Sequence, residues 1–243
     1  MEHLLASIHA GPKVIESLIP EVRQIIRPLR EDTEQLQLGL DPDSASPLVA
    51  LARHEVSLLD QLEKALAQGL GTLTAKKRLS LERQVRIITP ELTRVVEHWE
   101  LLLESVTGGG VTLPLGELLS SRPDHGSSRP LRRLLVFGAP IDVLVTLPPR
   151  AAVGALSLLS EMSRNHATPA LYVTREAEDL LCLEFKAQGS DPAGSMVCMI
   201  PLHAPLPMSR EVAFWVLTRI GARPLESGDD RIRLPIHSAP SAG

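Results

Sequence analysis

The feature that most constrains the fold of this chain is a repeat of apolar residues, at steps of three and four, between Thr74 and Val106. The repeat consists of Leu81, Val85, Ile88, Leu92, Val95, Trp99, Leu102 and Val106. These steps place the side chains on one side of an α-helix, in the pattern of helices that pack in bundles. A second apolar stripe predicts another helix over Pro47–Gln68, with Ser46 as its N-cap and Gly69 at its end.

The two predicted helices are separated by a short connection, so we expect them to form an antiparallel hairpin. We reason that one hairpin cannot bury both apolar stripes and that two copies would pair into a four-helix bundle, which predicts a homodimer. In the first helix the stripe includes Glu55, and His54 lies about 100° to one side of it. This spacing predicts a histidine on the flank of a bundle, neither in its core nor fully in solvent.

Beyond Gly108 the pattern changes to short apolar runs with turns between them. Strands are predicted over Leu131–Phe137, Ile141–Thr146, Leu171–Thr174, Leu180–Phe185, Met196–Ile200 and Ile232–Ile236, and helices over Arg150–Asn165 and Ser209–Ile220. This order predicts an α+β fold, in which a helical hairpin that forms a dimeric four-helix bundle is followed by an α/β sandwich. We divide the chain into an N-terminal helical extension (1–40), the hairpin (41–108), the sandwich (109–238) and a tail (239–243).

Composition excludes several classes of partner and site. The formal net charge is -4 and no basic stripe with interleaved aromatic residues occurs, so nucleic acid is not expected as a partner. No apolar run is long enough to span a bilayer and the N-terminus lacks a basic signal region, so we expect a cytoplasmic protein with no membrane partner. Cys182 and Cys198 show no CxxC spacing, and no set of residues has metal-ligand spacing, so we expect reduced thiols and no metal site.

Several segments, taken in order, carry a resemblance to a known family. Ala52-Arg53-His54-Glu55 lies in the first hairpin helix, and Ala155–Met162 lies in the first helix of the sandwich. The other segments are Val95–Ser105 with Val111–Leu119, and Gly221–Ser227 with Arg231–Pro235. Together they resemble the cytoplasmic core of bacterial sensor histidine kinases: the phosphoacceptor His-Glu, the helix that carries an asparagine pair, the linker into the ATPase-like domain, and the closing strand pair. The resemblance implies that residues 109–238 form a histidine-kinase-ATPase-like sandwich.

The chain departs from that family where nucleotide would bind. The family uses two asparagines on one helix, an Asp-x-Gly-x-Gly turn for the adenine, and a glycine-rich lid. Here Ser157 and Glu161 stand at the asparagine positions, the turn reads Ala187-Gln188-Gly189, and no Gly-x-Gly lid follows before Ser209. A glutamate facing the phosphates would repel them. We therefore expect that ATP binding is lost and that the chain uses no cofactor.

A His-bearing hairpin dimer with a degenerate ATPase-like domain is similar to the bacterial two-domain histidine phosphotransferases. The resemblance implies that His54 attacks the aspartyl phosphate of a response-regulator receiver domain, that Glu55 orients the imidazole or accepts its proton, and that Arg53 neutralises phosphoryl charge. The aspartate and magnesium would come from the receiver.

The residues that follow the histidine also differ from the family. Leu58 and Leu59 replace the polar residue and proline four and five positions after it. With Leu51 they would enlarge an apolar surface near His54 on which a receiver helix could dock.

A second reading stays open. The chain would be a non-catalytic, pseudokinase-like dimer that binds and regulates a signalling or transcription partner and carries no phosphoryl group. Substitution of His54 by Gln distinguishes the two readings, because it abolishes transfer in the first and changes little in the second.

Overall fold

The computed structural model describes residues 23–24, 27, 31, 46–68, 74–120, 131–138, 142–162, 169–187, 196–224 and 231–236. The chain forms two compact units, Met1–Val96 and Glu97–Gly243, and the boundary between them falls inside one long helix. The predicted boundary, at residues 108 and 109, lies further along the chain. The last turns of the helix belong to the second unit because Glu97 and His98 contact residues of that unit that are distant in the sequence. The predicted tail, and the predicted N-terminal extension apart from the four residues given above, lie outside the described residues.

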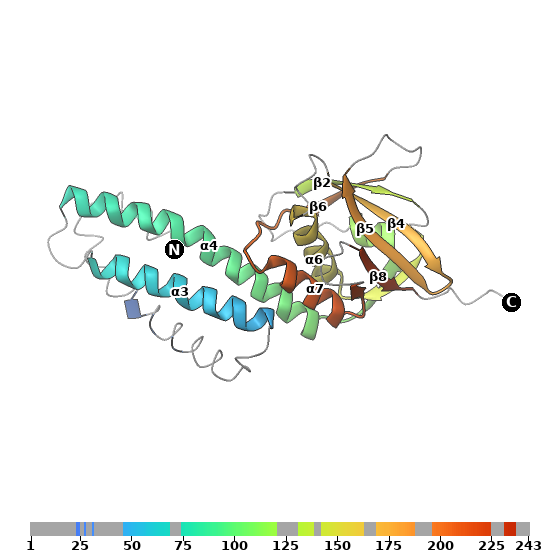
Figure 1. Ribbon diagram of the computed structural model, residues 1–243, viewed down its shortest axis with the longest axis horizontal. Helices are drawn as coiled ribbons and strands as arrows, with labels where there is room; N and C mark the ends of the chain where they lie inside the picture. The colour runs from blue at the N-terminus through green and yellow to red at the C-terminus, as the bar shows by residue number, and fades with distance from the viewer. Residues whose placement is uncertain are drawn as a thin grey trace. The chain divides into compact units, whose positions relative to one another are not determined.

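The hairpin consists of α3, Pro47–Gln68, and α4, Ala75–Thr107, and α3 runs beside the first part of α4 (Figure 1). Both helices begin at a capping side chain. The Ser46 Oγ accepts a hydrogen bond of 3.3 Å from the backbone N–H of Leu48. The Thr74 Oγ1 accepts one of 3.3 Å from the N–H of Lys77. The predicted bounds of both helices are therefore confirmed, because local caps and periodicity determine them.

The apolar stripes of the two helices are buried within a single chain. Leu51 and Leu62 of α3 and Leu81 and Val85 of α4 are almost completely buried. The expectation that one hairpin cannot bury both stripes is therefore wrong at these positions, and a second copy is not required to cover them. The end of the α4 stripe differs, since Val106 is 58% exposed.

The second unit contains two sheets and three further helices. Its strands are β1 (Val111–Pro114), β2 (Leu131–Phe137), β3 (Leu144–Leu147), β4 (Pro169–Ala177), β5 (Leu180–Ala187), β6 (Met196–Pro201), β7 (Arg223–Pro224) and β8 (Arg231–Pro235). The helices are α5 (Leu115–Ser120), α6 (Pro149–Met162) and α7 (Ser209–Arg219). Strands β1 and β3 form a two-stranded sheet, and the others form a six-stranded sheet in the order β6-β2-β4-β5-β8-β7.

The connection from β2 to β4 positions the central helix of this unit. These two strands pair in parallel, while the other neighbours in the large sheet are antiparallel. Parallel neighbours need a crossover, and α6 supplies it by packing against the sheet. Helix α7 packs in turn on α6. As a result the residues of α6 from Ala151 to Glu161 are buried.

The α+β class is confirmed: a helical hairpin precedes a mixed sheet with its helices. Every predicted strand and helix of the second unit corresponds to an observed element, with ends that differ by a few residues. The sequence interpretation treated β1 and α5 as linker and named β7 only within a closing strand pair. These elements are short, and β1 depends on pairing with β3, where Thr112 lies opposite Thr146. No helix in the described part of the chain has the length and apolar character needed to cross a membrane.

Candidate functional site

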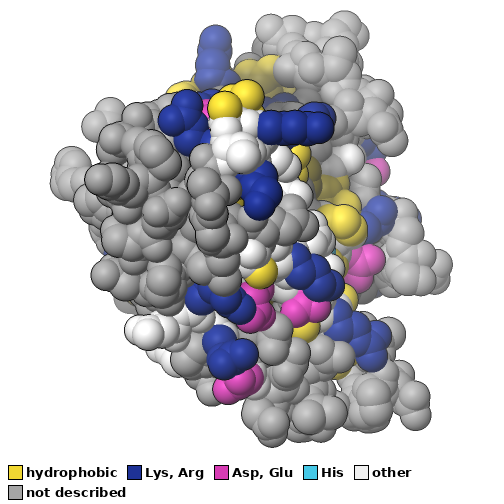
Figure 2. All heavy atoms as spheres, turned by 90° about the vertical axis from the view of Figure 1, so that its left-hand side faces the viewer, with side chains coloured by type: hydrophobic (Ala, Val, Ile, Leu, Met, Phe, Trp, Pro, Cys, Tyr) yellow, Lys and Arg dark blue, Asp and Glu magenta, His cyan; other side chains and the backbone are white. Residues whose placement is uncertain are grey.

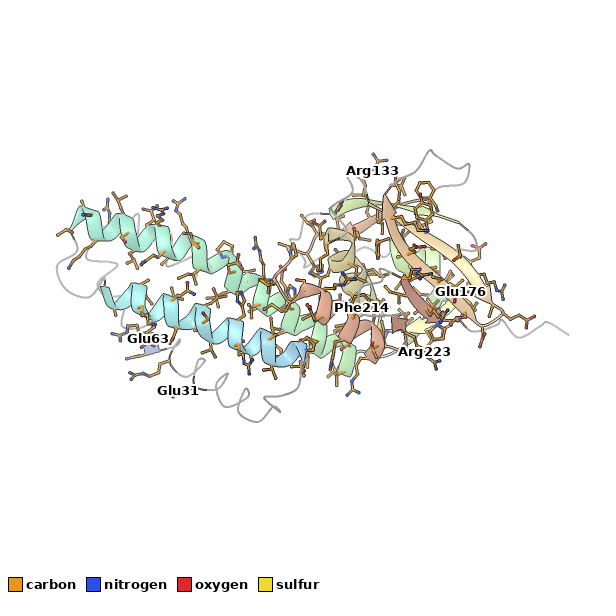
Figure 3. All side chains as sticks on the ribbon, viewed as in Figure 1. Glu31, Glu63, Arg133, Glu176, Phe214 and Arg223 are labelled. Atoms are coloured by element: carbon orange, nitrogen blue, oxygen red, sulfur yellow. The ribbon has the colours of Figure 1, made fainter. Side chains whose placement is uncertain are left out.

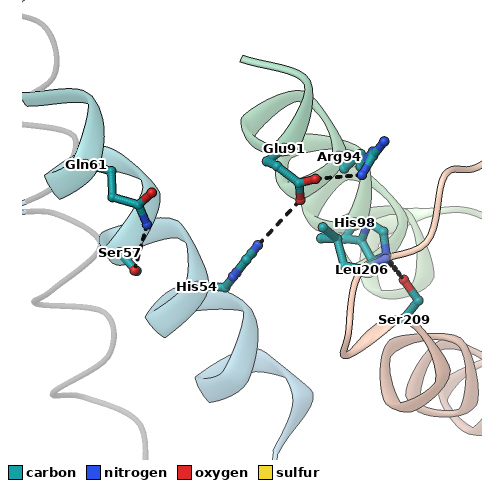
Figure 4. A network of polar contacts seen from close by, with 8 residues as sticks. All are labelled: His54, Ser57, Gln61, Glu91, Arg94, His98, Leu206 and Ser209. Atoms are coloured by element: carbon teal, nitrogen blue, oxygen red, sulfur yellow. Dashed lines mark hydrogen bonds and ion pairs between the residues drawn. The ribbon is translucent and has the colours of Figure 1, made fainter. Parts of the chain in front are cut away.

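The candidate nucleophile, His54, lies on the flank of α3 as predicted, with its side chain 26% exposed. Its imidazole points toward α4 (Figure 4), where Nε2 lies 3.9 Å from Oε2 of Glu91. The other carboxylate oxygen of Glu91 accepts a hydrogen bond of 2.7 Å from Nη1 of Arg94. Arg94 thus holds the carboxylate in place, and the His54–Glu91 distance is that of an ion pair when the imidazole is protonated.

The nitrogen that would attack a phosphoryl group is not accessible in this arrangement. His54 Nε2 is buried and has no hydrogen-bond partner among the described residues. A distance of 3.9 Å to Glu91 is too long for a hydrogen bond. Attack by Nε2 therefore requires the ring to turn away from α4.

The structure does not bring the predicted catalytic residues Arg53, His54 and Glu55 together. Arg53 is exposed, His54 is half-buried and Glu55 is buried. Consecutive helical residues point about 100° apart, so three in a row cannot converge on one group. The charged groups nearest His54 come instead from α4, which the sequence interpretation did not identify because spacing within α3 carries no information about them.

The predicted docking surface is not a surface in this structure. Leu51, Leu58 and Leu59 are all buried, with exposed fractions of 6% or less. The prediction that a receiver helix docks on them is wrong for this conformation. The apolar stripe that made these residues attractive as a docking site is the same stripe that packs them into the interior.

The positions that resemble a degenerate nucleotide site are filled by protein. Ser157 and Glu161 of α6 are buried. The Glu161 carboxylate forms an ion pair with the guanidinium of Arg132 on β2. The sequence predicted a carboxylate that would repel phosphate, and the structure adds the cation that neutralises it. Ala187 is the last residue of β5, and Gly189 lies outside the described residues.

A buried histidine in the second unit has a partner that sequence spacing could not identify. Nε2 of His98 lies 2.6 Å from Oγ of Ser209, 111 residues further along the chain (Figure 4). The same Oγ accepts a hydrogen bond of 2.6 Å from the backbone N–H of Leu206. Both side chains are completely buried. A substrate cannot reach them, so this Ser–His pair connects the end of α4 to the start of α7 rather than forming a nucleophile.

A second buried histidine lies in the same unit. Nδ1 of His203 is 3.9 Å from Oε2 of Glu97, one residue before His98 on α4. The two histidine contacts together join the last turns of α4 to the segment that leads into α7. They explain why these turns belong to the second unit.

The thiols are buried, and no metal centre is found in the part of the chain that the structure describes. Cys182 and Cys198 are free cysteines. Desolvation by burial raises the pKa of both thiols, and the nearby carboxylate of Glu176 adds to this effect at Cys182. Protonated thiols are poor nucleophiles and poor metal ligands. No group of three His, Cys, Asp or Glu side chains in these regions could hold a metal ion.

No family model matches the chain, and no curated protein matches its sequence.

Proposed function

We propose that this chain is a non-catalytic signalling protein, related in design to a histidine-kinase core, that regulates a partner by binding it. The observation that carries the proposal is the position of His54 Nε2, which is buried against α4 and faces Glu91 at 3.9 Å. A phosphoryl group cannot be placed on this atom without displacing the ring. The burial of the predicted docking leucines around it supports the same conclusion.

The packing of α6 supports the absence of ATP-dependent chemistry. In the proposed kinase-like relationship this helix would face the nucleotide, yet its residues from Ala151 to Glu161 are buried. The pairing of β7 with β8 supports an ATPase-like origin of the sandwich, because the closing strand pair lies at the position in the sequence that the resemblance implies. We propose that the sandwich is retained as a folded scaffold without its nucleotide site.

A homodimer remains part of the proposal, but on a different surface from the one first expected. The apolar stripes of the hairpin are already covered, whereas Leu103 and Val106 near the end of α4 are 63% and 58% exposed. Trp99 is half-buried on the same side of the helix. These residues are the apolar part of α4 that a second copy or a regulated partner can cover.

The histidine phosphotransferase is the second candidate, and one observation favours it. The Glu91 carboxylate, held by Arg94, lies close to the imidazole and is placed to orient it. In this reaction a nitrogen–phosphorus bond to Nε2 forms as the bond to the receiver aspartate breaks, and the aspartate leaves as a carboxylate. Glu91 rather than Glu55 would then be the positioning carboxylate.

The experiment uses receiver domains from the same organism, phosphorylated beforehand by a promiscuous kinase. We expect no acid-labile label on this chain, while a receiver or other partner co-elutes with it equally well for the unaltered protein and for His54→Gln. Label that appears on the unaltered chain and disappears in His54→Gln would overturn the proposal and establish the phosphotransferase. A Glu91→Gln variant that lowers this label would then confirm the positioning role. Far-ultraviolet circular dichroism of each variant shows that loss of label is not loss of fold.

A further inference from the structure

The first turns of α4 carry a concentration of positive charge that the rest of the described hairpin does not neutralise. Lys76, Lys77, Arg78 and Arg83 have no ion-pair partner among the described residues, and Glu82, the one acid in this stretch, pairs with Arg86 at 2.8 Å. This cluster occurs in a chain whose formal net charge is -4. Figure 2, which faces the start of α4, shows Lys and Arg side chains gathered around hydrophobic ones in its upper part.

Other cations of the hairpin are treated differently. Arg23 lies 3.6 Å from Glu63, Lys64 lies 3.8 Å from Asp60, and Arg94 lies 2.7 Å from Glu91. Figure 3 shows the Glu63 carboxylate on the side of α3 away from α4. The unneutralised cations are therefore a local property of the start of α4.

The position of these cations also opposes the helix dipole. The first turn of a helix carries partial positive charge and favours acidic side chains. In α4 this turn contains no acidic residue, and Lys76, Lys77 and Arg78 lie in it. The arrangement weakens the helix when the protein is alone. An external anion would relieve both the dipole and the mutual repulsion of the cations.

Two large aliphatic side chains lie among the cations. Leu79 is 62% exposed and Ile87 is 60% exposed. They are about two turns, or roughly 12 Å, apart, and Arg83 lies midway between them on the same side of the helix. The exposed side of this part of α4 thus alternates positive and aliphatic groups. We call Lys76, Leu79, Arg83, Arg86 and Ile87 the basic face.

We propose that the basic face binds the surface of an anionic membrane. Lys and Arg side chains would meet lipid phosphates, while Leu79 and Ile87 enter the boundary between headgroups and acyl chains. A bilayer accepts two separated aliphatic groups without a matched pocket for each, which an acidic protein would have to supply. Nucleic acid fits less well, because the face has no aromatic side chain to stack on a base. This binding is peripheral and needs no spanning helix, so the earlier expectation of no membrane partner, which considered spanning segments, does not exclude it.

The experiment is sedimentation of the full chain with vesicles of phosphatidylcholine alone and of phosphatidylcholine mixed with phosphatidylglycerol. We expect sedimentation with the mixed vesicles only, weakening as salt is raised. The double variant Lys76→Gln/Arg83→Gln should weaken binding about tenfold or more, since each cation near an anionic surface contributes substantially. Leu79→Ser/Ile87→Ser should also weaken it severalfold, because the aliphatic contribution is lost.

Two matched variants control for changes that do not involve the basic face. Leu103→Ser alters a leucine of the same helix that is 63% exposed, and Lys64→Gln removes an exposed cation of α3 that is paired with Asp60. Both should bind as the unaltered protein does, and all substituted residues are on the surface, so circular dichroism should be unchanged.

Three results would overturn the proposal. The first is no sedimentation with anionic vesicles. The second is sedimentation that the basic-face variants leave unchanged. The third is binding to polyglutamate or duplex DNA that depends on the same cations and outcompetes the vesicles, which would assign the face to a protein or nucleic-acid partner.

Discussion

Removing the cation of the buried ion pair between β2 and α6 should destabilise the second unit strongly. Glu161 is 3% exposed, and its partner Arg132 has a side chain that is 23% exposed. In Arg132→Met the carboxylate stays in the interior without its cation. Breaking a buried pair from one side costs about 3–5 kcal/mol, and we expect about 3 kcal/mol here because water reaches part of the site through Arg132.

Urea denaturation followed by tryptophan fluorescence measures this change in the right part of the chain. The protein has two tryptophans, Trp99 and Trp215, and both belong to the second unit. With a slope of about 2 kcal/mol per molar urea, a loss of about 3 kcal/mol lowers the midpoint by about 1.5 M. Because only this unit reports, unfolding of the hairpin does not complicate the transition.

The neighbouring arginine of β2 supplies the matched control. Arg133 is exposed and points away from α6 (Figure 3), so Arg133→Met should change stability by about 0.5 kcal/mol or less. The double variant Arg132→Met/Glu161→Gln removes the buried charge and should recover most of the loss. An Arg132→Met protein as stable as Arg133→Met would refute the reasoning, and so would a double variant no more stable than the single one.

Three further changes test other parts of the second unit by the same denaturation assay. Ser209→Ala leaves the buried Nε2 of His98 and a buried backbone N–H without their partner and should cost about 1–3 kcal/mol, whereas alanine at an exposed serine of α4 should cost almost nothing. Gly138→Ala should cost more than about 2 kcal/mol, because its φ is +101° and a Cβ would meet a carbonyl oxygen of β4, while Gly109→Ala, where a Cβ meets nothing within 4 Å, should be near neutral. Burial raises the pKa of the Cys198 thiol above its usual 9.0, so the unfolded chain loses this proton first and stability should fall as pH rises above about 9; Cys198→Ala should show a weaker fall, and an unchanged pH profile would contradict the assigned burial.

The sequence by itself determined the helices of the hairpin. Periodicity and capping depend on residues within a few positions of one another, so Ser46, Thr74 and the apolar repeat were sufficient to place α3 and α4. The same reasoning placed His54 on a flank. It also identified the longer strands of the second unit, whose apolar runs stand between clear turns.

Contacts between distant residues were decided only by the tertiary structure. The pairs His98–Ser209, His54–Glu91 and Arg132–Glu161 join different elements, and no spacing along the chain encodes which side chains will meet. Packing also decided the fate of Leu51 and its neighbours, since a stripe of leucines reads equally well as an interior seam or as a docking surface until the element that covers it is known. Local chemistry therefore fixed what each segment becomes, and the free energy of burying those segments against one another fixed which of its groups remain accessible.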